Sequence, residues 1–116
     1  MTNCPINNMF PGQPFIELPV ITSGFADRLI QEHGSAQQSI VLTEECSELQ
    51  KALCKNFRRE NKDLPINKQT VVEEMTHVLI SMQVVMRAYG ILQDELDAEF
   101  TRKLSDYIDI GQNGNI

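Results

Sequence analysis

The sequence contains few cysteines and no long apolar run. No apolar stretch approaches the roughly 20 residues that a helix needs to cross a bilayer, so we expect no contact with a membrane. The three cysteines, Cys4, Cys46 and Cys54, form neither an even set nor a CxxC pair. This spacing argues against a disulfide framework or a thiolate zinc site, and we therefore expect three free thiols.

Positive charge is scarce as well. Ten Lys and Arg residues against 16 Asp and Glu residues give a net charge of -6. Proteins that hold nucleic acid through charge usually carry a basic excess, so we expect no nucleic-acid partner, although a nucleotide carried with a metal ion fits. The first residues, MTNCPINNMFPG, lack the basic and apolar regions of a secretory signal, which predicts a cytoplasmic protein.

The composition that is present fits one small globular domain. With 41% hydrophobic and 22% charged residues, a chain of 116 residues can bury a modest core. Four of the five prolines fall within the first 19 residues, which predicts an extended arm there. We expect a single domain over residues 1–116, with an arm at 1–21, a helical core at 22–109 and a tail at 110–116.

Apolar residues recur at helical spacing through the rest of the chain, and nothing reads as a strand. The predicted helices cover residues 23–33, 35–59, 68–89 and 92–109. The residues suited to begin the first three helices are Thr22 or Ser23, Ser35 and Asn67, while Gly34 and Gly90 suit helix ends. Short connections between such helices favour antiparallel neighbours, so the fold class is all-α and resembles a four-helix bundle.

Acidic residues interrupt the apolar stripes of the two long helices. Glu45 lies beside the stripe of the second predicted helix, with Glu48 at its edge, and Glu74 and His77 lie one turn apart on the third. Like charges on facing helices would repel each other unless a cation lies among them. Magnesium prefers carboxylate oxygens and is commonly shared with substrate phosphates, so these side chains predict a magnesium site.

The segments EECSELQKALCK and EEMTHVLISM together resemble the all-α nucleoside triphosphate pyrophosphohydrolases, the MazG-like family related to dimeric dUTPases. The family pattern is EExxE, a spacer and then ExxD. Glu44, Glu45 and Glu48 match the first motif, and Glu74 matches the start of the second. His77 stands where the family has Asp. The resemblance covers roughly residues 28–108.

The resemblance implies hydrolysis of a nucleoside or deoxynucleoside triphosphate to the monophosphate and pyrophosphate, in a homodimer or homotetramer. Metal would be held by Glu45, Glu48, Glu74 and His77, with manganese preferred over magnesium because imidazole is a softer ligand than carboxylate. Glu44 would orient or deprotonate the attacking water. Two further residues are candidates for substrate contacts: Lys103 for phosphate, and Gln38 for the base, together with its neighbour Gln37.

Two other functions remain open at this stage. Glu-x-x-His on a helix also occurs in di-iron carboxylate bundles, but one chain supplies a single copy, so a symmetric dimer would have to supply the second. Alternatively, His77 has disabled the site and the chain is a non-catalytic module that binds nucleotides or a protein. The basic run of Lys51, Lys55, Arg58 and Arg59 could attract polyphosphate, but a solvent-facing helix end is the simpler interpretation, because cations favour helix C-termini.

Overall fold

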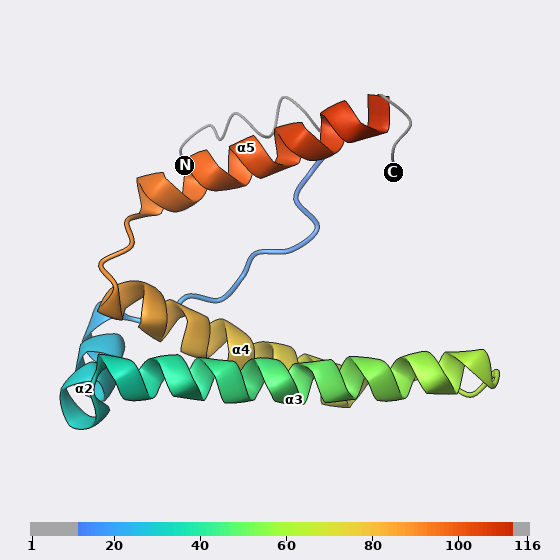
Figure 1. The fold of residues 1–116 in the computed structure, drawn as a ribbon, viewed down its shortest axis with the longest axis horizontal. Helices are drawn as coiled ribbons and strands as arrows, with labels where there is room; N and C mark the ends of the chain where they lie inside the picture. The colour runs from blue at the N-terminus through green and yellow to red at the C-terminus, as the bar shows by residue number, and fades with distance from the viewer. Residues whose placement is uncertain (1–11, 113–116) are drawn as a thin grey trace. The chain divides into compact units, whose positions relative to one another are not determined.

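The computed structural model describes residues 12–112, and side chains through residue 109. Over this range the protein contains helices and no strand, which confirms the all-α fold class. The helices are α2 (Ser23–His33), α3 (Ser35–Asn61), α4 (Lys68–Ala88) and α5 (Gln93–Gln112), as Figure 1 shows.

The chain divides into two compact units. One unit is Pro19–Gly90 and holds α2, α3 and α4; the other joins Met1–Leu18 with Ile91–Ile116 and holds α5. Within α5, Arg102 forms ion pairs with Glu99 and Asp106 along the helix surface. The single domain expected from the sequence stays a prediction, and each unit is described by itself.

In the larger unit, α3 and α4 form an antiparallel hairpin, with α2 at its open end (Figure 1). At the closed end, the Asn56 side chain accepts a hydrogen bond from the Asn67 backbone N–H (2.8 Å) and donates one to its carbonyl (3.2 Å). Asn56 is only 8% exposed, so a buried amide joins the end of α3 to the start of α4. This amide fixes the register in which α3 and α4 lie side by side.

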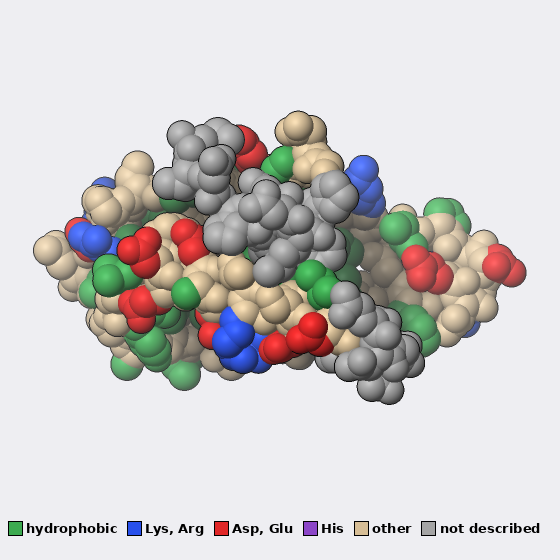
Figure 2. All heavy atoms as spheres, turned by 90° about the horizontal axis from the view of Figure 1, so that it is seen from above, with side chains coloured by type: hydrophobic (Ala, Val, Ile, Leu, Met, Phe, Trp, Pro, Cys, Tyr) green, Lys and Arg blue, Asp and Glu red, His purple; other side chains and the backbone are tan. Residues whose placement is uncertain are grey.

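The buried core of this unit is small. Among the described residues, the buried apolar ones are Ala26, Ala52 and Val84, and Val84 is the largest of them. Larger apolar side chains of α3 and α4 stay about half exposed, among them Phe57 at 64% and Met75 at 50%. On the face displayed in Figure 2, apolar side chains reach the surface between charged ones. The core of the single chain is therefore thin.

Several predicted helix ends are confirmed. α2 spans the expected residues, and the Thr22 hydroxyl accepts a hydrogen bond from the Phe25 N–H at 3.1 Å. Asn67 caps α4 by accepting from the Thr70 N–H at 3.2 Å. Gly90 follows α4 with φ at +68°, the left-handed conformation that glycine adopts without strain.

Other predicted ends are wrong by a few residues. Gly34, not Ser35, is the N-cap of α3; Ser35 is its first helical residue, and no side chain caps this end. α3 continues to Asn61, two residues past its expected end, and α5 begins at Gln93 and runs three residues into the expected tail. The second residue of that tail is Gly111, and a glycine costs a helix only about 1 kcal/mol and does not stop it as a proline would.

The remaining expectations concern the arm, the thiols and the membrane. Residues 12–21 contain no helix, in line with the expected arm, while 1–11 and 113–116, including Cys4, lie outside the described residues. Cys46 and Cys54 are free thiols, as expected. None of the helices between residues 12 and 112 is long and apolar enough to cross a lipid bilayer.

Candidate metal centre

Three potential metal ligands meet between α3 and α4. Glu45 comes from α3, and Glu74 and His77 come from α4. The His77 Nδ1 atom lies 3.1 Å from Glu45 Oε2 and 3.7 Å from Glu74 Oε2. One ligand atom from each side chain lies within 4.8 Å of the other two, so a single ion could contact all three. We call these three residues the acidic cluster.

The helical positions explain this arrangement. Glu74 and His77 are three residues apart on α4, which places them on one face, one turn apart. The antiparallel packing of α3 then brings Glu45 to the same level. The side chains of Glu74 and Glu45 are 20% and 27% exposed, while that of His77 is 56% exposed. The carboxylates therefore lie at the base of the cluster and the imidazole at its solvent edge.

The donor set suits a divalent cation. Two carboxylates and one imidazole offer hard oxygen ligands and one nitrogen, a set accepted by manganese and, less readily, by magnesium. Three protein ligands leave coordination positions for water or for the phosphate oxygens of a substrate. An imidazolium would offset one of the two carboxylate charges without metal, because its Nδ1–H can donate to either carboxylate.

The two other acids of the EExxE motif lie outside this cluster. The edge of the apolar stripe predicts that Glu48 faces inward with Glu45, and this is wrong: its side chain is 53% exposed and pairs with Lys51 Nζ at 3.1 Å. Glu44 is exposed to solvent. It directly precedes Glu45, so its side chain is turned about 100° around the helix. The structure thus brings together three of the four predicted metal ligands.

The predicted substrate-contacting residues are placed less favourably. Gln38, near the start of α3, is only 6% exposed in the single chain. Lys103 is exposed on α5, which belongs to the other unit. His33, the other histidine, lies at the end of α2 with its Nε2 atom 3.8 Å from Glu32. It is not part of the acidic cluster, so a second Glu-x-x-His would still have to come from another chain.

A further ionic contact on α4 was not anticipated from the sequence. Arg87 donates two hydrogen bonds to the Asp27 carboxylate of α2, at 2.9 and 3.1 Å. These bonds, more than the charge of the guanidinium, hold the pKa of Asp27 below its usual range. One turn earlier, Gln83 accepts from the Ile21 N–H and donates to the Pro19 carbonyl. The polar side of α4 thus attaches α2 and the segment before it.

Comparison with known proteins identifies no family for this chain. No protein-family model, no curated protein and no solved structure matches this chain. The acidic motifs and the geometry of the acidic cluster are therefore the features from which a function can be argued.

Proposed function

We propose that this protein hydrolyses a nucleoside or deoxynucleoside triphosphate to the monophosphate and pyrophosphate, with a divalent metal ion held by the acidic cluster. The observation that carries the proposal is the meeting of Glu45, Glu74 and His77 within 4.8 Å on two packed helices. The resemblance of both motifs to MazG-like pyrophosphohydrolases supports it.

In this proposal Glu45, Glu74 and His77 would hold the ion, which would supply positive charge for the phosphate oxygens and lower the pKa of a bound water. Water attacks the α-phosphorus, the bond from that phosphorus to the bridging oxygen breaks, and pyrophosphate leaves. Glu44, the neighbour of Glu45, is the proposed acceptor of the proton that the water gives up. Lys103 and Gln38 are proposed to contact phosphate and base.

Glu48 is also a proposed metal ligand. It follows Glu45 by three residues and so lies one turn along the same side of α3. To bind metal, its carboxylate has to leave Lys51, which it contacts at 3.1 Å. The exchange is feasible because exposed ion pairs of this kind contribute little to stability. Glu48→Gln should therefore abolish metal binding without unfolding the helices, while Lys51→Gln should leave metal binding intact or strengthen it.

We also propose that the protein is a homodimer or homotetramer. The half-exposed apolar side chains of α3 and α4, with Phe57 and Met75 as examples, form more apolar surface than a stable monomer usually leaves uncovered. Light scattering at micromolar concentration tests this directly. A strict monomer would contradict it.

The test of activity is a pyrophosphate-release screen across canonical and modified triphosphates, with magnesium and with manganese. We expect turnover in wild type and none in Glu74→Gln. Glu73→Gln is the matched control, because Glu73 is an exposed neighbour on α4 that contacts Gln69 instead of the cluster. Turnover that persists at full rate in Glu74→Gln would contradict the proposed metal site.

One observation favours a second candidate, a non-catalytic module. His77 contacts both carboxylates, and as an imidazolium it would satisfy them without metal. Manganese titrations at several pH values separate the two candidates. A metal site gains affinity as pH rises, because protons compete for its ligands. Absence of manganese binding at pH 8, together with no pyrophosphate release, would favour the module.

A further inference from the structure

Basic residues without an acidic partner gather at the closed end of the α3–α4 hairpin. Four of the ten Lys and Arg residues pair with carboxylates: Arg28, Lys51, Arg87 and Arg102. Five of the other six are Lys55, Arg58, Arg59, Lys62 and Lys68. Residues 55–68 contain these five bases and two acids, a net charge of +3 in a chain whose total is -6. We call this region the basic end.

A cavity of ≈ 480 Å³ opens between the end of α3 and the start of α4. Three cations line it, namely Lys55 and Arg59 from α3 and Lys68 from α4, and its polar lining includes Thr70. An adjoining cavity of ≈ 340 Å³ shares Lys55 and Arg59. Its other cations are Arg58 and Lys62. No acidic residue in the described part of the chain lines either cavity, so none there neutralises the five positive charges.

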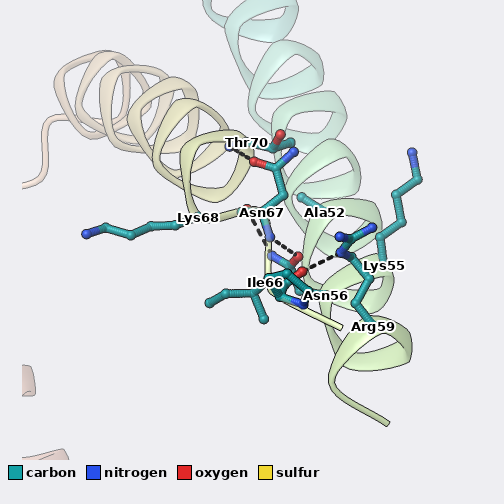
Figure 3. Close-up of a pocket in the computed structure, with 9 residues that line it drawn as sticks. Ala52, Lys55, Asn56, Arg59, Ile66, Asn67, Lys68 and Thr70 are labelled. Atoms are coloured by element: carbon teal, nitrogen blue, oxygen red, sulfur yellow. Dashed lines mark hydrogen bonds between the residues drawn. The ribbon is translucent and has the colours of Figure 1, made fainter. Parts of the chain in front are cut away.

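Figure 3 shows how the walls of the larger cavity are held. The Asn56 side-chain amide is occupied by its two hydrogen bonds to the Asn67 backbone across the turn. Arg59 donates its Nε–H to the Pro65 carbonyl at 2.6 Å, which fixes the guanidinium and leaves its Nη nitrogens for another acceptor. Lys55 and Lys68 extend from opposite sides. Hydrogen bonds thus hold the centre of the cavity wall, and two long cationic side chains lie at its rim.

The position of Lys68 argues for an anion more strongly than the bases at the end of α3. Arg58 and Arg59 lie in the last turn of α3, where the helix dipole favours cations. Lys68 is the first residue of α4, where the dipole disfavours a cation, and the first turn of α4 contains no acid to offset it. A bound anion would stabilise Lys68 and the start of α4 together.

We propose that the basic end binds a small anion with two or more phosphate groups. An arginine fork matches phosphate oxygens, and the number of cations exceeds what one phosphate group can neutralise. A volume of ≈ 480 Å³ lies within the range of small-molecule sites. No aromatic side chain among the described residues lines either cavity, so these residues offer no stacking platform of the kind that single-stranded nucleic acid uses.

This site is separate from the acidic cluster. Arg59 follows Glu45 by 14 residues in one continuous helix, which places it about 21 Å along the axis at 1.5 Å per residue. The proposal therefore does not depend on the proposed hydrolysis. A polyphosphate anion at the basic end would act on the protein as an effector, or as a stabiliser of the α3–α4 turn.

The experiment is a titration of the full chain with sodium pyrophosphate, followed by amide NMR in buffer cleared of divalent metal by a chelating resin. We expect saturable shifts at the amides of residues 55–70, with inorganic phosphate binding at least about tenfold more weakly. Arg59→Gln should weaken pyrophosphate about tenfold or more, the effect of losing one charge-assisted hydrogen bond. Arg28→Gln, which removes the same charge from α2, should change the affinity less than twofold.

Because Arg59 also holds the Pro65 carbonyl, Arg59→Gln could alter the turn itself. The double variant Lys55→Gln/Lys68→Gln removes two rim charges whose side chains hold no part of the turn, and it should also weaken pyrophosphate at least tenfold. Absence of shifts in residues 55–70 at millimolar pyrophosphate would overturn the proposal. Equal weakening by Arg28→Gln, or binding of an acidic peptide or oligonucleotide where pyrophosphate fails, would overturn it as well.

Discussion

The acidic cluster and the basic end lie on the same two helices and carry opposite unbalanced charges. In the acidic cluster, the Glu45 and Glu74 carboxylates are mostly buried and share one imidazole. At the basic end, five cations line two cavities without any acid in the walls. Net charge therefore does not predict which ions a region can bind: a chain of net charge -6 has one region suited to a cation and another suited to an anion.

The largest expected effect is on metal binding by the acidic cluster. Glu74→Gln removes a direct ligand, and even indirect partners of metal ligands are worth about 10- to 100-fold in affinity, so manganese should bind at least about 100-fold more weakly. Calorimetric titration measures this, with Glu73→Gln as control. Pyrophosphate binding at the basic end should be unchanged in both variants. A joint loss would mean that the two regions form one site.

The next largest effect concerns the Asn56–Asn67 hydrogen bonds, which hold the turn at the basic end. Asn56→Ala leaves the part-buried N–H and carbonyl of Asn67 without their partner, at about 1 to 2 kcal/mol for each group. We expect a loss of about 2 to 4 kcal/mol in the free energy of unfolding, measured by urea denaturation. Asn61→Ala, at the exposed end of the same helix, should stay within about 0.5 kcal/mol of wild type. Equal stability of both variants would show that the Asn56 amide does not hold the turn.

The sequence predicts the helices well because their signals are local. Apolar spacing locates α2, α3 and α4, and the Thr22 and Asn67 caps form the hydrogen bonds expected of them. Errors fall where local preferences compete. Ser35 suits a cap, yet Gly34 takes that place, and the glycine after Ile110 does not end α5 because its cost is small.

The acidic cluster is predictable in part for the same reason. The spacing of Glu74 and His77 fixes their common face, whereas the meeting with Glu45 depends on how two helices pack. The inward position predicted for Glu48 is wrong because Lys51, three residues further along α3, holds its carboxylate at the helix surface. The bases at residues 51–59 look like a solvated helix terminus in the sequence, because the cavities beside them form only when the turn folds back. Lys68, directly after the Asn67 cap, is the local signal that could have indicated an anion site.

A smaller effect concerns which metal ion the acidic cluster prefers. His77→Asp replaces a neutral nitrogen ligand with a carboxylate, so magnesium should gain affinity relative to manganese by severalfold. The ratio of magnesium- to manganese-supported turnover measures this, and the ratio of binding constants serves if turnover is absent. His77→Ala is the companion variant and should lower binding of both ions. If neither variant changes the ratio, His77 is not a metal ligand and the site consists of carboxylates alone.

The smallest effect concerns an ionic contact that needs no external ion, the Asp27–Arg87 pair. Both side chains are about half exposed, so their bond adds little to stability, but its pH dependence has a definite sign. The pKa of Asp27 is lowered in the folded state, chiefly by its hydrogen bonds to Arg87. The stabilisation is therefore complete above the pKa of the unfolded carboxyl and is lost as pH falls through the lower folded value. Asp27→Asn should melt slightly below wild type at pH 7, and the two melting curves should converge in strong acid.

Asp109→Asn, on the surface of α5, is the control and should match wild type at neutral pH. A gap between wild type and Asp27→Asn that stays constant down to pH 2 would show that the carboxylate charge contributes nothing, in contrast to the acidic cluster, where charge is the basis of the proposed binding.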